Sequence, residues 1–181
     1  MVSRLDYHTR AGKTGAQEAE ERCTVLAIIW HSRTGAARAL AQAVREGAGE
    51  ASRLIAAADA APRDLLDARA YVFACPENLA SMSGMMKEMF DRCYYPALGR
   101  IEGRPYATVI TAGSDGEGAQ RQIDRIVTGW RLKRVAEPLI VNLGAQTPAQ
   151  IMADKRVQES ELAQCRELGA AMTEGLSLGI F

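Results

Sequence analysis

From Thr24 onwards, the chain alternates five short apolar segments with segments of helical periodicity. The apolar segments are TVLAIIW (24–30), SRLIAA (52–57), RAYVFAC (69–75), YATVITAG (106–113) and PLIVNLG (138–144). Strands that alternate with helices predict a parallel sheet with helices on both faces, because a parallel crossover needs a long connection. We therefore expect an α/β fold with a doubly wound, five-stranded parallel sheet. Five strands fit the order 2-1-3-4-5.

The segments between these strands predict where helices pack. AAPRDLLDA (60–68) predicts a turn and a short helix, and we expect longer helices over 117–133 and 161–175. Proline lacks the N–H that a central strand uses, so Pro76 is expected to end the third strand. Apolar residues at helical spacing predict these buried positions: Leu40, Ala43, Val44, Gly47; Met82, Met85, Met86, Met89, Phe90, Cys93; Ile123, Ile126, Val127, Trp130; Leu162, Cys165, Leu168, Met172.

The length of 181 residues fits one domain with a full core. Residues 1–22 are polar and without sustained periodicity, so we interpret them as an N-terminal arm, and 23–181 as a single domain. Within the arm, AGKTG (11–15) resembles the end of a phosphate-binding P-loop. Tyr7 stands where that motif needs its first glycine, so the pattern predicts no P-loop.

Charge and cysteine content exclude several classes of protein. Lys and Arg together number 22, as do Asp and Glu, so the formal net charge is zero and no basic face for nucleic acid is predicted. No apolar run approaches the ~20 residues that cross a bilayer. The N-terminus lacks an apolar h-region, so we expect no secretory signal. The four cysteines share no CxxC spacing and there are two histidines, a pattern that predicts free thiols rather than a zinc site. We expect a cytoplasmic protein.

The loop after the first apolar segment carries the strongest candidate site. Ligands of such sheets bind at the carboxyl ends of the strands, where the strand order reverses. Here that place lies between the first and third strands. The backbone N–H groups of a helix N-terminus can hold a phosphate there. The loop contains hydroxyl donors and a glycine that lets the backbone close on an anion. Its candidate residues are Ser32, Arg33, Thr34, Gly35, Ala36 and Ala37. The alternative is a plain N-cap by Ser32 or Thr34.

Two further loops lie at the same edge of the predicted sheet. Residues 76–84 join the third strand to its helix in a loop longer than the ~2–6 residues that are typical, and Asn78 can donate and accept at a ring edge. The alternative is an ordinary connection capped by Ser81 or Ser83. Residues 113–118 contain three glycines, which indicates either close approach to a ligand or a mobile tip that touches nothing.

With these loops placed, the sequence from Thr24 to Leu176 resembles the flavodoxin-like superfamily. Within it, the chain is similar to the NAD(P)H-dependent FMN reductase and quinone reductase families. The resemblance rests on HSRTGAAR (31–38), PENLASMSGMMKEMFDR (76–92) and TAGSDGEGA (111–119). Relatives often have Thr-Gly-Asn-Thr in the phosphate loop. Here Ala36 and Ala37 replace the last two, which removes two side-chain donors worth ~1 kcal/mol each.

The resemblance implies FMN as cofactor and NAD(P)H as co-substrate. By that likeness, Ser32, Thr34 and the backbone of 33–37 would hold the FMN phosphate. Pro76, Glu77, Asn78 and Leu79 would run along the isoalloxazine ring, with Ser83 nearby, and Gly113, Ser114 and Asp115 would border its other side. No catalytic residue is predicted, because the flavin carries the chemistry. His31 is a candidate proton donor, with a structural role as its alternative. The resemblance also implies a homodimer or tetramer.

Three functions fit this site. The first is an FMN-dependent oxidoreductase that passes electrons from NAD(P)H to a small-molecule acceptor such as a quinone or a flavin. The second is a flavodoxin-type electron carrier. By the same resemblance, such a carrier would be strongly acidic and would have aromatic residues beside the flavin. The third is a flavin-free scaffold, favoured by Ala36 and Ala37. Neutral charge and aromatic-free loops at 76–84 and 113–118 favour the oxidoreductase. The fold by itself cannot decide between the three.

Overall fold

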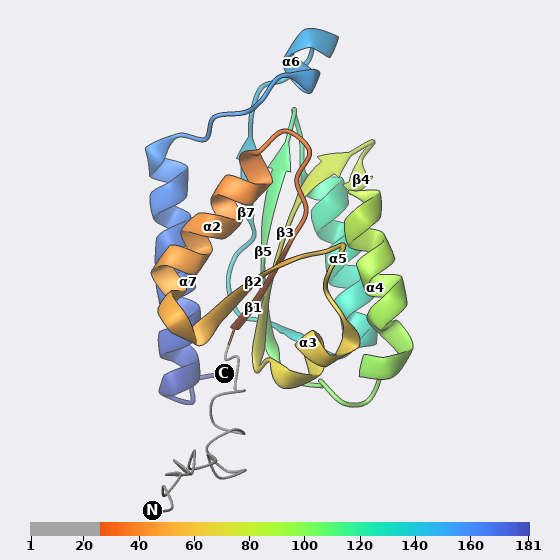
Figure 1. Cartoon of the computed structure of the whole chain (residues 1–181), viewed down its shortest axis with the longest axis vertical. Helices are drawn as coiled ribbons and strands as arrows, with labels where there is room; N and C mark the ends of the chain where they lie inside the picture. The colour runs from red at the N-terminus through yellow and green to blue at the C-terminus, as the bar shows by residue number, and fades with distance from the viewer. Residues whose placement is uncertain (1–25) are drawn as a thin grey trace, which may run out of the picture.

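The computed structural model describes residues 26–181 (Figure 1). The predictions of an N-terminal arm over 1–22, of a domain boundary at residue 23 and of a P-loop resemblance at 11–15 lie outside the described residues. So do Cys23 and the first two residues of the first predicted strand.

The parallel sheet follows the predicted order. Strand β1 (Leu26–Trp30) lies between β2 (Ser52–Ala56) and β3 (Ala70–Asn78), and β3 pairs with β5 (Pro105–Ala112). The fifth position holds two pieces, β6 (Lys133–Arg134) and β7 (Leu139–Asn142), which pair with opposite ends of β5. The order 2-1-3-4-5 is therefore confirmed, with its last strand interrupted. Pro138 stands just before β7 and has no N–H for a ladder.

The expectation that Pro76 ends the third strand is wrong. Strand β3 continues to Asn78, and Pro76 pairs with Thr111 of β5. The carbonyl of Ala74 accepts from His31 N at 3.0 Å, so that edge of β3 faces β1, and Pro76, two residues further, faces the same way. Strand β1 has ended by then, so no ladder bond is lost at the missing N–H. Strand β3 then turns back into the unpredicted antiparallel strand β4 (Ser81–Met82).

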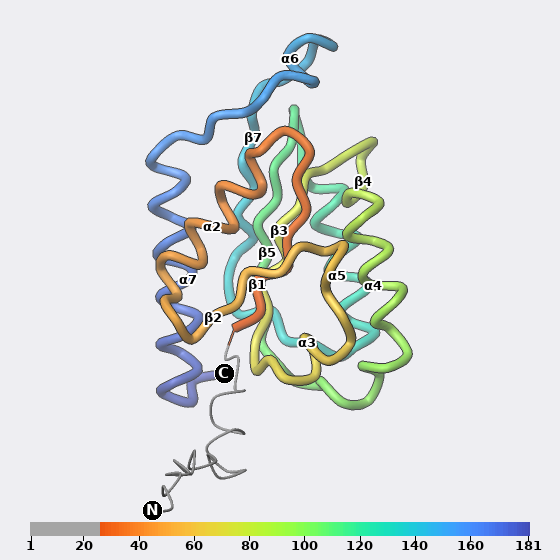
Figure 2. Tube along the Cα trace, in the orientation of Figure 1, coloured from red at the N-terminus to blue at the C-terminus, as the bar shows by residue number. Residues whose placement is uncertain are grey.

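Helices cover both faces of the sheet (Figures 1 and 2). Helices α2 (Ala36–Ala48) and α7 (Glu159–Ser177) pack on one face, and α2 is followed by a 3-10 turn, η1 (Gly49–Ala51). On the other face lie α3 (Pro62–Asp67), α4 (Gly84–Ala97) and α5 (Glu117–Gly129). A further short helix, α6 (Pro148–Met152), lies beyond the carboxyl ends of the strands.

Most predicted inward positions are buried, but Gly47, Ile126, Leu162 and Leu168 are half-buried. Met82 is buried but belongs to β4, and Met85 on α4 is exposed. Helix α5 ends at Gly129 rather than at residue 133, and α7 is longer than predicted at both ends. Gly47 faces α7 instead of the sheet: a Cβ built there would lie 1.9 Å from the carbonyl oxygen of Arg166. The two helices therefore pack backbone against backbone.

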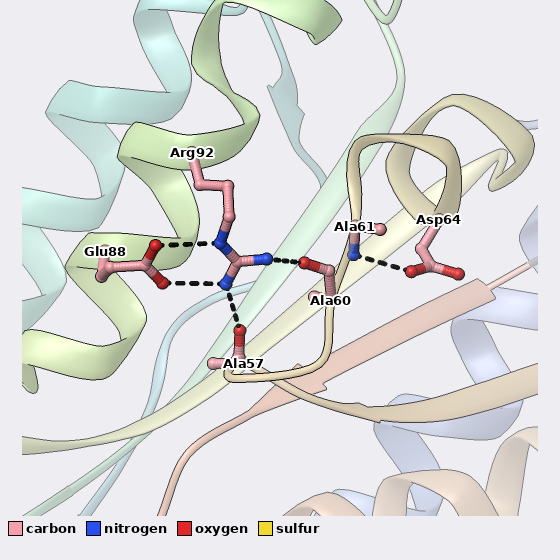
Figure 3. Close-up of polar contacts among 6 residues, drawn as sticks. All are labelled: Ala57, Ala60, Ala61, Asp64, Glu88 and Arg92. Atoms are coloured by element: carbon pink, nitrogen blue, oxygen red, sulfur yellow. Dashed lines mark hydrogen bonds and ion pairs between the residues drawn. The ribbon is translucent and has the colours of Figure 1, made fainter.

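Arg92 of α4 fixes the loop that follows β2 (Figure 3). Its Nε and Nη2 donate to the Glu88 carboxylate at 2.9 and 2.8 Å. Nη2 also donates to the Ala57 carbonyl at 2.9 Å, and Nη1 donates to the Ala60 carbonyl. One turn further, Asp64 accepts from Ala61 N at 2.8 Å. These bonds hold residues 57–61 against α4, where Ala57 and Ala60 are also buried in the core.

Candidate functional site

A cleft of about 400 Å³ opens at the carboxyl ends of β1, β3 and β5. The three loops singled out in the sequence meet there, as the strand order predicts. Of the predicted site residues, the lining includes Arg33, Thr34, Pro76, Glu77, Asn78, Leu79, Gly113 and Ser114. The other six predicted residues, namely Ser32, Gly35, Ala36, Ala37, Ser83 and Asp115, are outside this lining. Of these six, Gly35, Ala36 and Ala37 form the start of α2 behind Thr34.

The N-terminus of α2 has free backbone donors. Gly35 is the N-cap residue, with φ +91°, and among the described residues no side chain caps the helix. The first helical bond runs from Ala39 N to Gly35 O at 3.0 Å, so the N–H groups of Ala36 and Ala37 precede it. Ser32 Oγ accepts from Gly35 N at 3.1 Å instead of capping the helix. The simple N-cap interpretation therefore does not hold.

The β3–β4 hairpin forms a second wall with a strained tip. Its two turn residues, Leu79 and Ala80, have φ of +54° and +55°, although neither is glycine. Two positive φ angles characterise the tight turn that usually contains Asn-Gly, and this conformation costs a non-glycine residue ~1–2 kcal/mol. The Leu79 side chain is fully exposed at the rim of the cleft. Such strain persists only where the surrounding structure holds it.

Contacts with α5 hold this hairpin. The Glu77 carboxylate accepts from Gly116 N and Ala119 N, both at 2.9 Å, so it caps the N-terminus of α5. On β4, Ser81 Oγ and Met82 N donate to Gln122 Oε1 at 2.6 and 3.0 Å. The Glu77 carboxylate is therefore already paired with α5, whereas Asn78 and Leu79 line the cleft beside it.

Gly118 allows this close approach of α5 to the hairpin. A Cβ built on Gly118 would lie 2.3 Å from the carbonyl oxygen of Ala80. Gly116 is similarly enclosed, because its Cβ would lie 2.4 Å from Ile140 Cγ2. Two of the three glycines in 113–118 thus serve packing.

The loop after β5 is tied down rather than free. Asn142 Nδ2 donates to the Ser114 carbonyl at 2.7 Å, and Leu143 N donates to the Ala112 carbonyl at 2.8 Å. A Cβ on Gly113 would lie 2.7 Å from the Ala145 carbonyl oxygen. The alternative of a mobile tip that touches nothing is therefore wrong.

His31 joins the first loop to the hairpin and does not line the cleft. Its Nδ1 lies 2.8 Å from Ser83 Oγ, and Ser83 is buried. Burial and, secondarily, the charge of Arg33 lower the pKa of His31, which favours the neutral ring. Burial also raises the pKa of the neighbouring Cys75 thiol to about 12, against smaller opposing hydrogen bonds from Ser83. A buried thiol of this kind stays protonated and inert.

Sequence reasoning missed a fourth wall, which we call the strap (residues 143–157). It leaves β7, forms α6 and returns past the start of α2, where Lys155 N donates to the Thr34 carbonyl at 2.7 Å. Leu143, Ala145, Ile151 and Lys155 line the cleft. A signal was present: Thr147 precedes a proline and stands three residues before Gln150, and the two side chains cap α6 reciprocally.

The described residues limit other interpretations. Over 26–181, no group of three or more His, Cys, Asp or Glu side chains is arranged to hold a metal ion. No helix in the same range is long and apolar enough to cross a membrane.

Solved structures show which class of fold this is. An archaeal flavodoxin superposes with a TM-score of 0.69 at 18% identity, over 84% of this chain and 98% of the flavodoxin. A WrbA-like flavodoxin from Agrobacterium tumefaciens gives 0.62 at 21%, over 84% and 97%. The flavodiiron core of Flv1 from Synechocystis gives 0.68 at 15%, with 90% of this chain matching 38% of that one. The fold is flavodoxin-like.

The sequence then identifies the family. Residues 49–146 match the model of NADPH-dependent FMN reductases. The chain belongs to this family, which makes it a flavin-binding oxidoreductase. No curated protein matches the sequence.

Proposed function

We propose that this protein is an FMN-dependent oxidoreductase that passes electrons from NAD(P)H to a small-molecule acceptor. One observation carries the proposal: the loop that leads into the uncapped N-terminus of α2 and the loops after β3 and β5 meet in a single cleft. The family and the fold agree with it.

The cleft fits FMN in size and chemistry. Its volume of about 400 Å³ lies within the ~300–1,000 Å³ of small-molecule sites. The N–H groups of Ala36 and Ala37 and the hydroxyls of Ser32 and Thr34 would hold the phosphate. Residues 76–79 and 113–115 would flank the ring. When bound, FMN supplies hydride and electron chemistry, and the protein supplies binding, orientation and local electrostatics.

The lining favours an enzyme over an electron carrier. No aromatic side chain lines the described cleft, so none is placed to cover a flavin ring from both sides. An open ring face would let NAD(P)H and then an acceptor approach in turn. Quinones and free flavins are the acceptor classes that we propose. Reaction in the cytoplasm and a homodimer or tetramer remain part of this proposal.

The protein's absorbance spectrum, before and after addition of FMN, tests the proposal. We expect FMN to bind tightly enough that the purified protein shows flavin absorbance bands. These bands should bleach when NADH or NADPH is added anaerobically. Binding without bleaching would favour the carrier. No binding at tens of micromolar FMN would favour the flavin-free scaffold.

A pair of variants tests the phosphate loop. Thr34→Ala should weaken FMN binding more than His31→Ala, because Thr34 lines the cleft and His31 does not. The dissociation constants from a fluorescence titration decide this. Equal losses in both variants would contradict the assignment of the loop.

A further inference from the structure

The start of α2 has no polar side chain to offer an anion. Ala36 and Ala37 are buried and apolar, so the start of α2 offers backbone donors only. A helix N-terminus contributes roughly half a positive charge. A phosphate that has lost its second proton carries a negative charge close to two. A side-chain cation beside the loop would supply what the two alanines lack.

Lys155 of the strap stands at this place. Its backbone N–H donates to the Thr34 carbonyl at 2.7 Å. Its own carbonyl oxygen is the nearest atom to a Cβ built on Gly35, at 3.9 Å. Lys155 is partly buried and lines the cleft together with Arg33 and Thr34, whereas its neighbours Asp154 and Arg156 are exposed and outside the lining.

The charges around the cleft favour an anion at this end. Three ionisable side chains line it: Arg33, Glu77 and Lys155. The Glu77 carboxylate is paired with the backbone of α5. Arg33, which belongs to the phosphate loop, and Lys155, which is bonded to that loop through its backbone, therefore leave a positive end beside Thr34.

The Lys155 ammonium is already bonded to neutral groups that an anion can replace. It donates to the carbonyls of Ala153 at 2.6 Å and Ile151 at 3.2 Å, and to that of Gln150, at the C-terminal end of α6. Hydrogen bonds between two charged groups are stronger than bonds from an ammonium to a neutral carbonyl. An ammonium on a flexible stem can rotate from one partner to the other.

We propose that Lys155 is the side-chain cation that binds the phosphate of the flavin, supplied by the strap in place of the donors missing at Ala36 and Ala37. This inference rests on the proposed function. The matched family region ends at residue 146, so Lys155 lies outside it. This phosphate-binding residue would then follow β7, at the edge of the sheet opposite to β2.

Riboflavin, which lacks the phosphate, separates this role from a purely structural one. FMN and riboflavin are titrated into the full chain and into three variants: Lys155→Met, Lys155→Arg and, as a matched control on the strap, Arg156→Met. Lys155→Met should weaken FMN about tenfold and leave riboflavin within about twofold. Lys155→Arg keeps the cation and should stay within about threefold of the parent for FMN, and Arg156→Met should change neither ligand.

The outcomes are distinct. If Lys155→Met weakens FMN and riboflavin equally, Lys155 is only an anchor of the strap and the inference is wrong. Unchanged FMN binding in Lys155→Met also overturns it, while leaving the proposed function intact. If the parent protein binds neither flavin, the proposed function itself fails and the inference falls with it. As a second readout, raising the salt concentration should weaken FMN binding more in the parent than in Lys155→Met.

Discussion

Two of the four walls of the cleft, the hairpin and the strap, are built in different ways. The hairpin wall, from Pro76 to Ser83, is tied to α5 by Glu77 and Gln122 and to the first loop through Ser83 and His31. The strap wall contains α6, in which every residue is exposed and none is buried. It is joined to the first loop by a backbone bond from Lys155.

This difference separates two tasks of a cofactor site. A wall held by several half-buried hydrogen bonds, two of them to the Glu77 carboxylate, can keep strained turn residues in place, as at Leu79 and Ala80. A wall with little buried surface opens at low cost, since local opening is easiest where few apolar contacts are lost. The hairpin is therefore suited to fixing a ring, and the strap to admitting and releasing a ligand.

Hydrogen exchange tests the comparison directly, and its expected effect is the largest. The amides of Ile151 and Ala153 in the strap should exchange at least about a thousandfold faster than that of Ala119, a difference of ~4 kcal/mol in opening free energy. FMN should slow exchange in the strap and leave Ala119 unchanged. If the amides of both walls are equally protected from exchange in the absence of ligand, the proposed difference between the walls is wrong.

Removal of the carboxylate that anchors the hairpin should have the next largest effect. Glu77→Ala leaves the N–H groups of Gly116 and Ala119 without their acceptor, so the free energy of unfolding should fall by about 3 kcal/mol. Chemical denaturation measures it. Glu117→Ala is the matched control, because it removes an exposed carboxylate from the first turn of the same helix and should cost below ~1 kcal/mol. Equal losses would mean that Glu77 is not a special anchor.

The same contrast explains what the sequence could predict. The sheet order and the meeting of three loops follow from apolar segments in alternation with helices, a strong and local signal. The hairpin wall was located, but the partner of Glu77 was not, because its bond to Gly116 spans 39 positions. A carboxylate next to an expected ring gives no sign that it caps a distant helix.

The strap was not predicted because α6 has no buried face. A helix of five exposed residues has no apolar periodicity to detect, and its sequence signals were the capping pattern at Thr147 and Gln150 and the proline at its first position. The continuation of β3 through Pro76 was also missed. There the decisive fact is that β1 ends first, which depends on the pairing of strands rather than on Pro76 itself.

Relief of the strained tip should have a smaller effect, of opposite sign. Ala80→Gly removes a left-handed penalty of ~1–2 kcal/mol and adds a backbone entropy cost of ~0.5–1 kcal/mol, so the free energy of unfolding should rise by about 0.5 kcal/mol. Gly144→Ala is the reverse change within the strap, at φ +63° with open space around it, and should lower stability by a similar amount. A loss of stability in Ala80→Gly would show that the turn is not strained.

The smallest expected effect is the pH dependence that comes from His31, the link between the hairpin and the phosphate loop. Folding lowers its pKa, so the unfolded chain binds more protons between the folded pKa and the ordinary value of 6.5. The contribution of neutral His31 to the free energy of unfolding is therefore fully present above pH 6.5 and is lost as the pH falls through the folded pKa. Unfolding can add at most one proton to His31, so the slope that this group gives to the unfolding free energy against pH is bounded.

His31→Gln should flatten the curve of unfolding free energy between neutral and mildly acidic pH, whereas Arg156→Gln, on the strap, should leave its shape unchanged. An identical acid limb in His31→Gln and the parent would show that folding does not lower the pKa of His31.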